Sequence, residues 1–136
     1  YLALQGRKSR LKAREREVLN LVVSQVNDCA YCLAAHTALG KMNGFTDEQI
    51  IELRTGAASF DSKLNALAAF VKDTTIQRGK PSPESVENLL AAGYDRGNLV
   101  DILVVIGDKI ISNFLHGVTQ IPVDFPAAAE LEAATI

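Results

Sequence analysis

The stretch Asn27-Asp28-Cys29-Ala30-Tyr31-Cys32-Leu33-Ala34-Ala35-His36 contains both cysteines of the 136-residue chain. In a helix, positions i, i+3 and i+7 lie on one face, so Cys29, Cys32 and His36 are predicted to share a side. Two helical Cα atoms three residues apart are roughly 5 Å from each other, and a disulfide tolerates that separation. The stretch therefore predicts a helix that begins with a reversible dithiol and carries an imidazole one turn later.

The positions of the two thiols favour different roles. Cys29 is expected at the helix N-terminus, where the dipole favours a thiolate and where the side chain is exposed. Cys32 is followed one turn later by His36, whose imidazole can accept the thiol proton. A thiolate attacks a peroxide to give a sulfenic acid, which the second cysteine converts to a disulfide. We favour Cys32 as the thiol whose proton is removed.

Three other interpretations of the cysteine pair stay open from the residues alone. The pair can serve a protein disulfide reductase or redox sensor, or it can be two small core residues. It can also belong to a zinc-binding structural domain with His36 and a fourth ligand, for which the chain offers His116, Glu17 and Asp28. A c-type haem site is excluded because Leu33, not histidine, follows Cys32.

The remaining sequence predicts helices separated by short turns, and no segment alternates as a strand does. We expect an all-α fold of about six helices and a single domain over residues 1–136. Three N-terminal signals stand out: Asp28 as an N-cap, a Thr46–Gln49 capping box, and Ser82 followed by Pro83. The expected helices span residues 12–26, 29–42, 46–55, 62–77, 83–90 and 95–118.

The last of these helices is nearly all apolar from residue 99 to residue 111, so we expect a central helix buried on more than one side. Asp101 and Asp108 interrupt it seven residues apart and are placed at a subunit interface or on the solvent side. His116 is interpreted as a helix C-terminal residue or a pocket wall. Residues 121–126 are expected to be extended, and the last ten residues to form a loose helix.

Composition narrows the class of protein. Fourteen Lys and Arg against sixteen Asp and Glu give a net charge of −2, which argues against a nucleic-acid partner. The apolar run from Leu99 to Ile106 is far shorter than the roughly 20 residues that span a bilayer, and no signal peptide is visible. We therefore expect a cytoplasmic protein with no membrane partner, no bound cofactor and no metal. Because the chain starts at Tyr1 without Met, we expect some native N-terminal residues to be missing.

The segment from Arg14 to Gly44 resembles the AhpD-like alkylhydroperoxidases of the carboxymuconolactone decarboxylase family. The resemblance is carried by an acidic residue in a Val/Leu-rich helix, the phrase Asn-Asp-Cys-Ala-Tyr-Cys, and a histidine four residues on. It implies an AhpD-like helical bundle with the CxxC motif at a helix N-terminus. It also implies a peroxidase of antioxidant defence that reduces a hydroperoxide and is re-reduced by a dithiol protein or small thiol, and a homotrimer or homohexamer.

The resemblance also implies roles for individual residues. Cys29 and Cys32 match the redox pair, His36 matches the histidine of a proton relay, and Glu17 matches the acidic residue that orients that histidine. Periodicity alone predicts a solvated Glu17 on the flank of its helix, paired with Arg14 or Arg16. Some family members carry a second histidine where this chain has Tyr31. The cysteine pair weighs against lactone decarboxylation, which does not depend on one.

Overall fold

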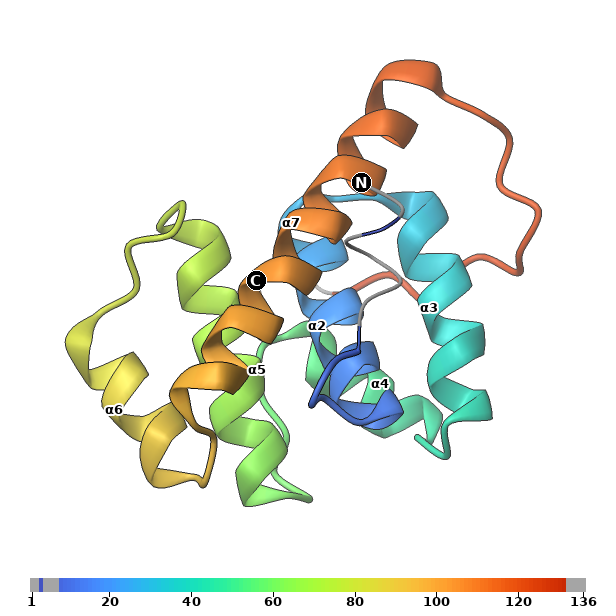
Figure 1. Cartoon of the computed structure of the whole chain (residues 1–136). Helices are drawn as coiled ribbons and strands as arrows, with labels where there is room; N and C mark the ends of the chain where they lie inside the picture. Colours follow the sequence, from blue (N-terminus) through green and yellow to red (C-terminus); the bar gives the residue numbers. More distant parts are fainter. Residues whose placement is uncertain (1–2, 4–7, 132–136) are drawn as a thin grey trace.

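The computed structural model describes residue 3 and residues 8–131, and this part of the chain contains six helices and no strand (Figure 1). The prediction of an all-α fold with about six helices is confirmed. None of the described helices is long and apolar enough to cross a membrane. In chain order the helices are α2 (Ala13–Val26), α3 (Ala30–Met42), α4 (Asp47–Arg54), α5 (Ser62–Ile76), α6 (Pro83–Ala91) and α7 (Arg96–Thr119).

Helix α2 occupies the centre of the bundle and packs against α3, α4, α5 and α7. Its valine and leucine side chains are removed from water, each contributing about 1.5–3 kcal/mol to folding. The fully buried apolar residues of this helix are Val18, Leu19, Leu21, Val22 and Val23. Because four helices surround α2, polar side chains on its flanks are also covered, and Glu17 is one of them.

The expectation that the long apolar helix is buried on more than one side is wrong for the single chain. Only one face of α7 packs on α2, and the opposite face is exposed. An all-round apolar sequence shows that a helix has no polar face, but it does not show what covers each side. The exposed apolar side chains of α7 are Val100, Leu103, Ile111, Phe114, Leu115 and Val118.

The predicted N-terminus of α3 is shifted by one residue. Cys29, not Asp28, is the N-cap, and its Sγ accepts a hydrogen bond from the backbone N–H of Cys32 at 3.4 Å. Asp28 instead adopts a left-handed conformation with φ 51°, which asparagine and aspartate tolerate better than most residues. The turn between α2 and α3 therefore uses Asp28 to reverse the chain and Cys29 to open the helix.

The other two N-terminal signals are confirmed. Thr46 and Gln49 form a reciprocal capping box at the start of α4, and Ser82 caps α6 with Pro83 in the first turn. After α7, residues 120–131 form no helix and return beside α3 (Figure 1). The expected loose helix over the last ten residues is absent from residues 127–131, and its remainder, residues 132–136, lies outside the described residues.

Candidate active site

The structure brings Glu17 of α2 and His36 of α3 together. Nδ1 of His36 lies 2.8 Å from Oε2 of Glu17, and the two side chains are 12% and 10% exposed. The other carboxylate oxygen of Glu17 accepts a hydrogen bond from Nδ2 of Asn20 at 3.1 Å. The periodicity-based placement of Glu17 in solvent is wrong, because α3 and α7 cover that flank of α2.

A residue that the sequence analysis passed over completes this cluster. Nζ of Lys109, from α7, lies 2.7 Å from Nε2 of His36, and Lys109 is buried. A carboxylate only accepts hydrogen bonds and an ammonium only donates them. With Glu17 and Lys109 both charged, the ring therefore carries its proton on Nδ1 and a lone pair on Nε2. The signal was available: Lys109 is a lysine within an almost wholly apolar stretch.

A hollow of about 360 Å³ gives this cluster access to solvent. It lies between α2, α3 and α7, and neither cysteine lines it. Its walls are formed by Ala13, Arg16, Glu17, Asn20, His36, Asp108 and Lys109. Protons can therefore leave the Glu17–His36–Lys109 cluster without passing the thiols.

Both thiols are free and buried, and the expected exposure of Cys29 is wrong. Cys29 is 3% exposed and Cys32 is 6% exposed. Burial, followed by the hydrogen bond with the Cys32 side chain, raises the pKa of Cys29 from 9.0 to about 11. Desolvation thus outweighs the helix N-terminus at this position, and Cys29 holds its proton at neutral pH.

Asn113 of α7 supports the cysteine end of the site. Its Nδ2 donates to Oγ of Ser24 at 3.3 Å, and its Oδ1 accepts from Nδ2 of Asn27 at 2.9 Å. Its side chain also hydrogen-bonds Cys29, which partly offsets the rise in the pKa of that thiol. Lys109 and Asn113 are four residues apart, so one face of α7 serves both the imidazole and the thiols.

Within the described residues, no hydrogen bond joins the His36 imidazole to either thiol, although they lie on the same helix. Glu17 and Lys109 occupy both ring nitrogens of His36. Cys32 lies one helical turn before His36 on α3, and both its backbone N–H and its side chain hydrogen-bond Cys29. Proton transfer between thiol and imidazole therefore requires a bridging water or a rotation of the ring.

Tyr31 and His116 lie outside the Glu17–His36–Lys109 cluster and contact each other. The Tyr31 ring packs against His116 at 5.5 Å, and a hydrogen bond with Asp124 raises the pKa of Tyr31. His116, in the last turn of α7, lies 3.1 Å from the carbonyl of Ile121 through Nε2. These contacts tie the start of α3 to the segment that follows α7.

The two aspartates of α7 differ in setting. Asp101 is buried and accepts a hydrogen bond from the backbone N–H of Arg10 at 2.8 Å, so it fixes the entry to α2. Asp108 lines the hollow beside Lys109. Residue 3 and residues 8–131 contain no cluster of three or more His, Cys, Asp or Glu side chains that could hold a metal ion.

The comparisons with known proteins identify the family and the fold. Residues 2–73, more than half of the chain, match the carboxymuconolactone decarboxylase family. The uncharacterized protein YdfG of Bacillus subtilis (strain 168) is 24% identical over 102 residues, covering 74% of this chain and 69% of that protein.

Solved structures share the fold. An Agrobacterium tumefaciens protein of unknown function, described as a candidate antioxidant defence protein AhpD, aligns with a TM-score of 0.77 at 24% identity over 90% of this chain and 88% of its own. An uncharacterized peroxidase-related protein from Silicibacter sp. TM1040 aligns with a TM-score of 0.75 at 23% identity over 99% of this chain and 68% of its own. A peroxidase-related AhpD core from Ralstonia eutropha JMP134 aligns with a TM-score of 0.77 at 19% identity over 90% of this chain and 65% of its own. By its sequence match and its AhpD-like fold, the chain belongs to the carboxymuconolactone decarboxylase family.

Proposed function

We propose that this chain is a thiol-dependent peroxidase that reduces hydrogen peroxide or an organic hydroperoxide through Cys29 and Cys32. The observation that carries the proposal is the buried Glu17–His36 hydrogen bond, which lies one helical turn beyond Cys32 and about two turns beyond Cys29, both free thiols. An acid, an imidazole and two thiols so arranged are the parts of a thiol redox cycle with proton transfer. Membership of the family and the fold shared with peroxidase-related proteins support it.

In the first step, Cys32 attacks the peroxide. Its thiol loses a proton to His36, and the thiolate sulfur bonds to the terminal peroxide oxygen while the O–O bond breaks. The products are a sulfenic acid on Cys32 and, after the proton is returned to the departing alkoxide, an alcohol or water. The raised pKa of Cys29 favours Cys32 as the attacking sulfur, because Cys29 stays protonated at neutral pH.

In the second step, Cys29 resolves the sulfenic acid. The Cys29 sulfur bonds to the Cys32 sulfur, and its proton leaves with the hydroxyl group as water. The two cysteines have then given two electrons to the peroxide and are joined as a disulfide. A dithiol protein or small thiol returns two electrons and two protons, which restores both free thiols.

Glu17 and Lys109 prepare His36 for proton transfer. The carboxylate holds the Nδ1 proton and the ammonium approaches Nε2, so the ring lies neutral between opposite charges. Once Nε2 is released from Lys109, the neutral imidazole can accept the Cys32 proton there through a bridging water, and Glu17 then stabilises the resulting imidazolium. The hollow beside Lys109 connects this cluster to solvent.

The site is tested by counting thiols before and after addition of one equivalent of peroxide. We expect two thiols to be lost as one intramolecular disulfide, with peroxide consumption sustained when a dithiol is supplied. A disulfide that forms with no catalytic consumption of peroxide would favour the redox-sensor or disulfide-reductase alternative. Thiols that are unreactive in a protein containing equimolar zinc would support the structural-domain alternative.

The order of the two cysteines is tested with single-cysteine variants. We expect Cys29→Ser to form a trappable sulfenic acid on Cys32, and Cys32→Ser to react much more slowly. In Cys32→Ser, burial should still hold the pKa of Cys29 above its ordinary value of 9.0, so the alkylation rate of Cys29 should still be rising above pH 9. A sulfenic acid trapped on Cys29 at neutral pH would reverse the assignment.

We also propose that the chain forms a single domain that assembles as a homotrimer or homohexamer in the cytoplasm. The exposed apolar face of α7 supports self-association, because a contiguous apolar surface of this kind marks an interaction site. Light scattering on the purified chain would measure the subunit number, and a strictly monomeric protein would contradict the assembly.

A further inference from the structure

A second hollow, of about 610 Å³, lies apart from the Glu17–His36–Lys109 cluster. It is enclosed by the end of α2, the start of α3, the end of α4 and the segment that follows α7. A volume of this size lies within the range that small-molecule sites occupy, roughly 300–1,000 Å³. Neither the peroxidase proposal nor the family resemblance gives this hollow a role.

Arg54, at the end of α4, is the charged group that lines its interior. The residue is only 5% exposed. Its Nε donates to Oε1 of Gln25 at 2.8 Å and its Nη1 donates to the carbonyl of Ala129 at 2.7 Å. Both acceptors are uncharged, and none of the ion pairs in the described ranges involves Arg54. Desolvation lowers the pKa of Arg54, and no carboxylate within residues 8–131 offsets that shift.

The groups around Arg54 compensate only part of the charge of its guanidinium. The C-terminal end of α4 carries partial negative charge, which favours a cation in the last turn. A guanidinium has five N–H donors, however, and the two bonds to Gln25 and Ala129 use two of them. A buried cation that lacks a counter-ion is costly, and a bidentate carboxylate is the partner that best fits the remaining donors.

The rest of the wall determines what can accompany the carboxylate. Leu33 of α3 and Val123, Phe125 and Leu131 of the final segment make much of the lining apolar. Asp28 and Glu130 also line the hollow but are exposed, so they lie toward solvent. Their negative charges disfavour polyanions such as nucleotides, whereas a single carboxylate at Arg54 with an uncharged body avoids them.

From these observations we propose that this hollow binds a small organic monocarboxylate, with the carboxylate on Arg54 and the apolar body along Leu33 and Phe125. The inference goes beyond the proposed peroxidase activity and does not depend on the thiol cycle. Because Asp28 and Ala30 line the hollow and flank Cys29 in the chain, the bound ligand lies beside the start of α3.

The test is a binding titration of the full chain with octanoate and with 1-octanol as its uncharged counterpart. We expect saturable octanoate binding and at least about tenfold weaker octanol binding, since a charge-assisted bidentate pair distinguishes the two. Arg54→Met should weaken octanoate binding by about tenfold or more and leave octanol unchanged, while Arg54→Lys keeps part of the preference. Arg10→Met, which removes an exposed cation paired with Asp95, is the matched control and should change neither affinity.

Three results would overturn the proposal. The first is octanoate affinity that survives Arg54→Met. The second is inorganic phosphate or acetate binding as tightly as octanoate, which would leave a general anion site with no role for the apolar wall. The third, which needs no variant to fold, comes from NMR of the unmodified chain: octanoate must shift the Arg54 Nε–H and Gln25 side-chain amide signals, and unmoved signals contradict the site.

Discussion

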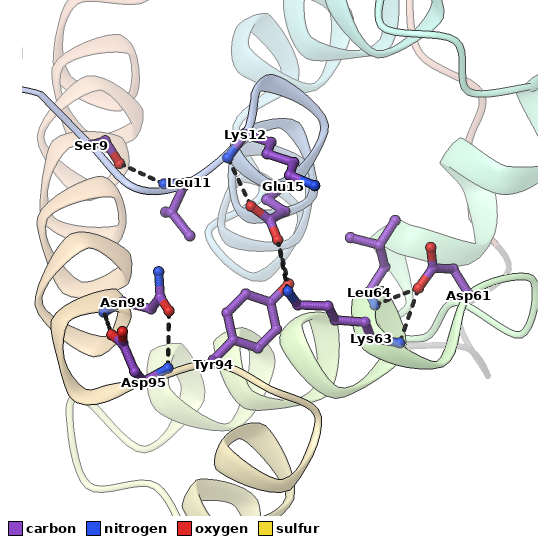
Figure 2. Close-up of polar contacts among 10 residues, drawn as sticks. All are labelled: Ser9, Leu11, Lys12, Glu15, Asp61, Lys63, Leu64, Tyr94, Asp95 and Asn98. Carbon is purple, nitrogen blue, oxygen red and sulfur yellow. Dashed lines mark hydrogen bonds and ion pairs between the residues drawn. The ribbon is translucent and has the colours of Figure 1, made fainter.

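Two buried glutamates of α2, Glu15 and Glu17, differ in what surrounds them. Oε2 of Glu15 accepts from the backbone N–H of Lys12 at 2.7 Å, and its Oε1 accepts from the Tyr94 hydroxyl at 2.9 Å (Figure 2). Nζ of Lys63 lies 3.9 Å from the same carboxylate. The two groups that donate hydrogen bonds to Glu15 are the Lys12 backbone amide and the buried Tyr94 phenol, and both hold their protons at neutral pH.

Glu17 is equally buried, but its partner is an imidazole. It bonds His36, which in turn contacts Lys109, and a hollow opens this cluster to solvent. Burial of an acid therefore does not by itself mark a functional site. An imidazole bonded to the acid, together with access to solvent, distinguishes Glu17 from Glu15. We therefore expect Glu15 to serve stability, and Glu17 is the glutamate that we propose for proton transfer.

The largest expected effect separates the two glutamates by activity. Glu17→Gln should lower kcat/KM for a hydroperoxide by about 10²-fold or more, the scale of lost acid–base catalysis, with little change in melting temperature. Glu15→Gln should keep its kcat/KM and lose stability instead. Steady-state kinetics and thermal unfolding of both variants check this, and equal kinetic losses in the two would remove the distinction.

The next largest effect is on the free energy of unfolding and comes from the Tyr94–Glu15 hydrogen bond. Tyr94→Phe removes the hydroxyl that bonds the buried Glu15 carboxylate and should lower the free energy of unfolding by about 2 kcal/mol. Tyr31→Phe is the matched control, because its hydroxyl partner Asp124 is exposed, and it should change stability far less. Urea unfolding measures both variants. Equal losses of unfolding free energy in the two variants would show that the Tyr94–Glu15 hydrogen bond is no more stabilising than an exposed one.

A smaller effect is expected from the two lysines. Lys109→Met should lower kcat/KM by about tenfold, because His36 loses the contact at Nε2 that orients its ring beside Glu17. Lys63→Met should leave kcat/KM unchanged, since Lys63 only approaches Glu15 at 3.9 Å. Lys109→Arg should recover part of the activity. In NMR, the Nε2 signal of His36 should shift in Lys109→Met and stay in place in Lys63→Met, because only the first variant removes the group bonded to Nε2. An unchanged signal in Lys109→Met would contradict the assignment.

The smallest effect is a slope of stability against pH. Burial and then Glu15 raise the pKa of Tyr94 above its ordinary value of 10.0. Above pH 10 the unfolded chain loses the phenol proton that the native chain keeps, so stability falls as pH rises. The contribution is about 1 kcal/mol per pH unit, and Tyr94→Phe should flatten the curve by that amount. An identical slope in both proteins, measured by unfolding between pH 9 and 11, would contradict the raised pKa.

Much of the fold could be predicted because its signals are local. The capping box at Thr46 and the Ser82–Pro83 start of α6 depend on residues within one turn, and both are confirmed. The N-cap of α3 could not be predicted from local signals, because Asp and Cys can both accept the N-terminal bond and only the turn after α2 selects between Asp28 and Cys29. The burial of α7 could not be predicted either, because periodicity does not report which neighbour covers a face.

Within the candidate site, the sequence determined Cys29, Cys32 and His36, because a short helical spacing fixes them on one face. The family resemblance added Glu17, which periodicity had placed in solvent. Only the tertiary structure supplied Lys109, Asn113 and Arg54. The first two come from α7, more than 70 residues beyond His36, and Arg54 meets its partner Gln25 from the end of α4. The physical reason is that hydrogen bonds between helices depend on how the helices pack, whereas spacing within one helix is set by its 3.6-residue turn.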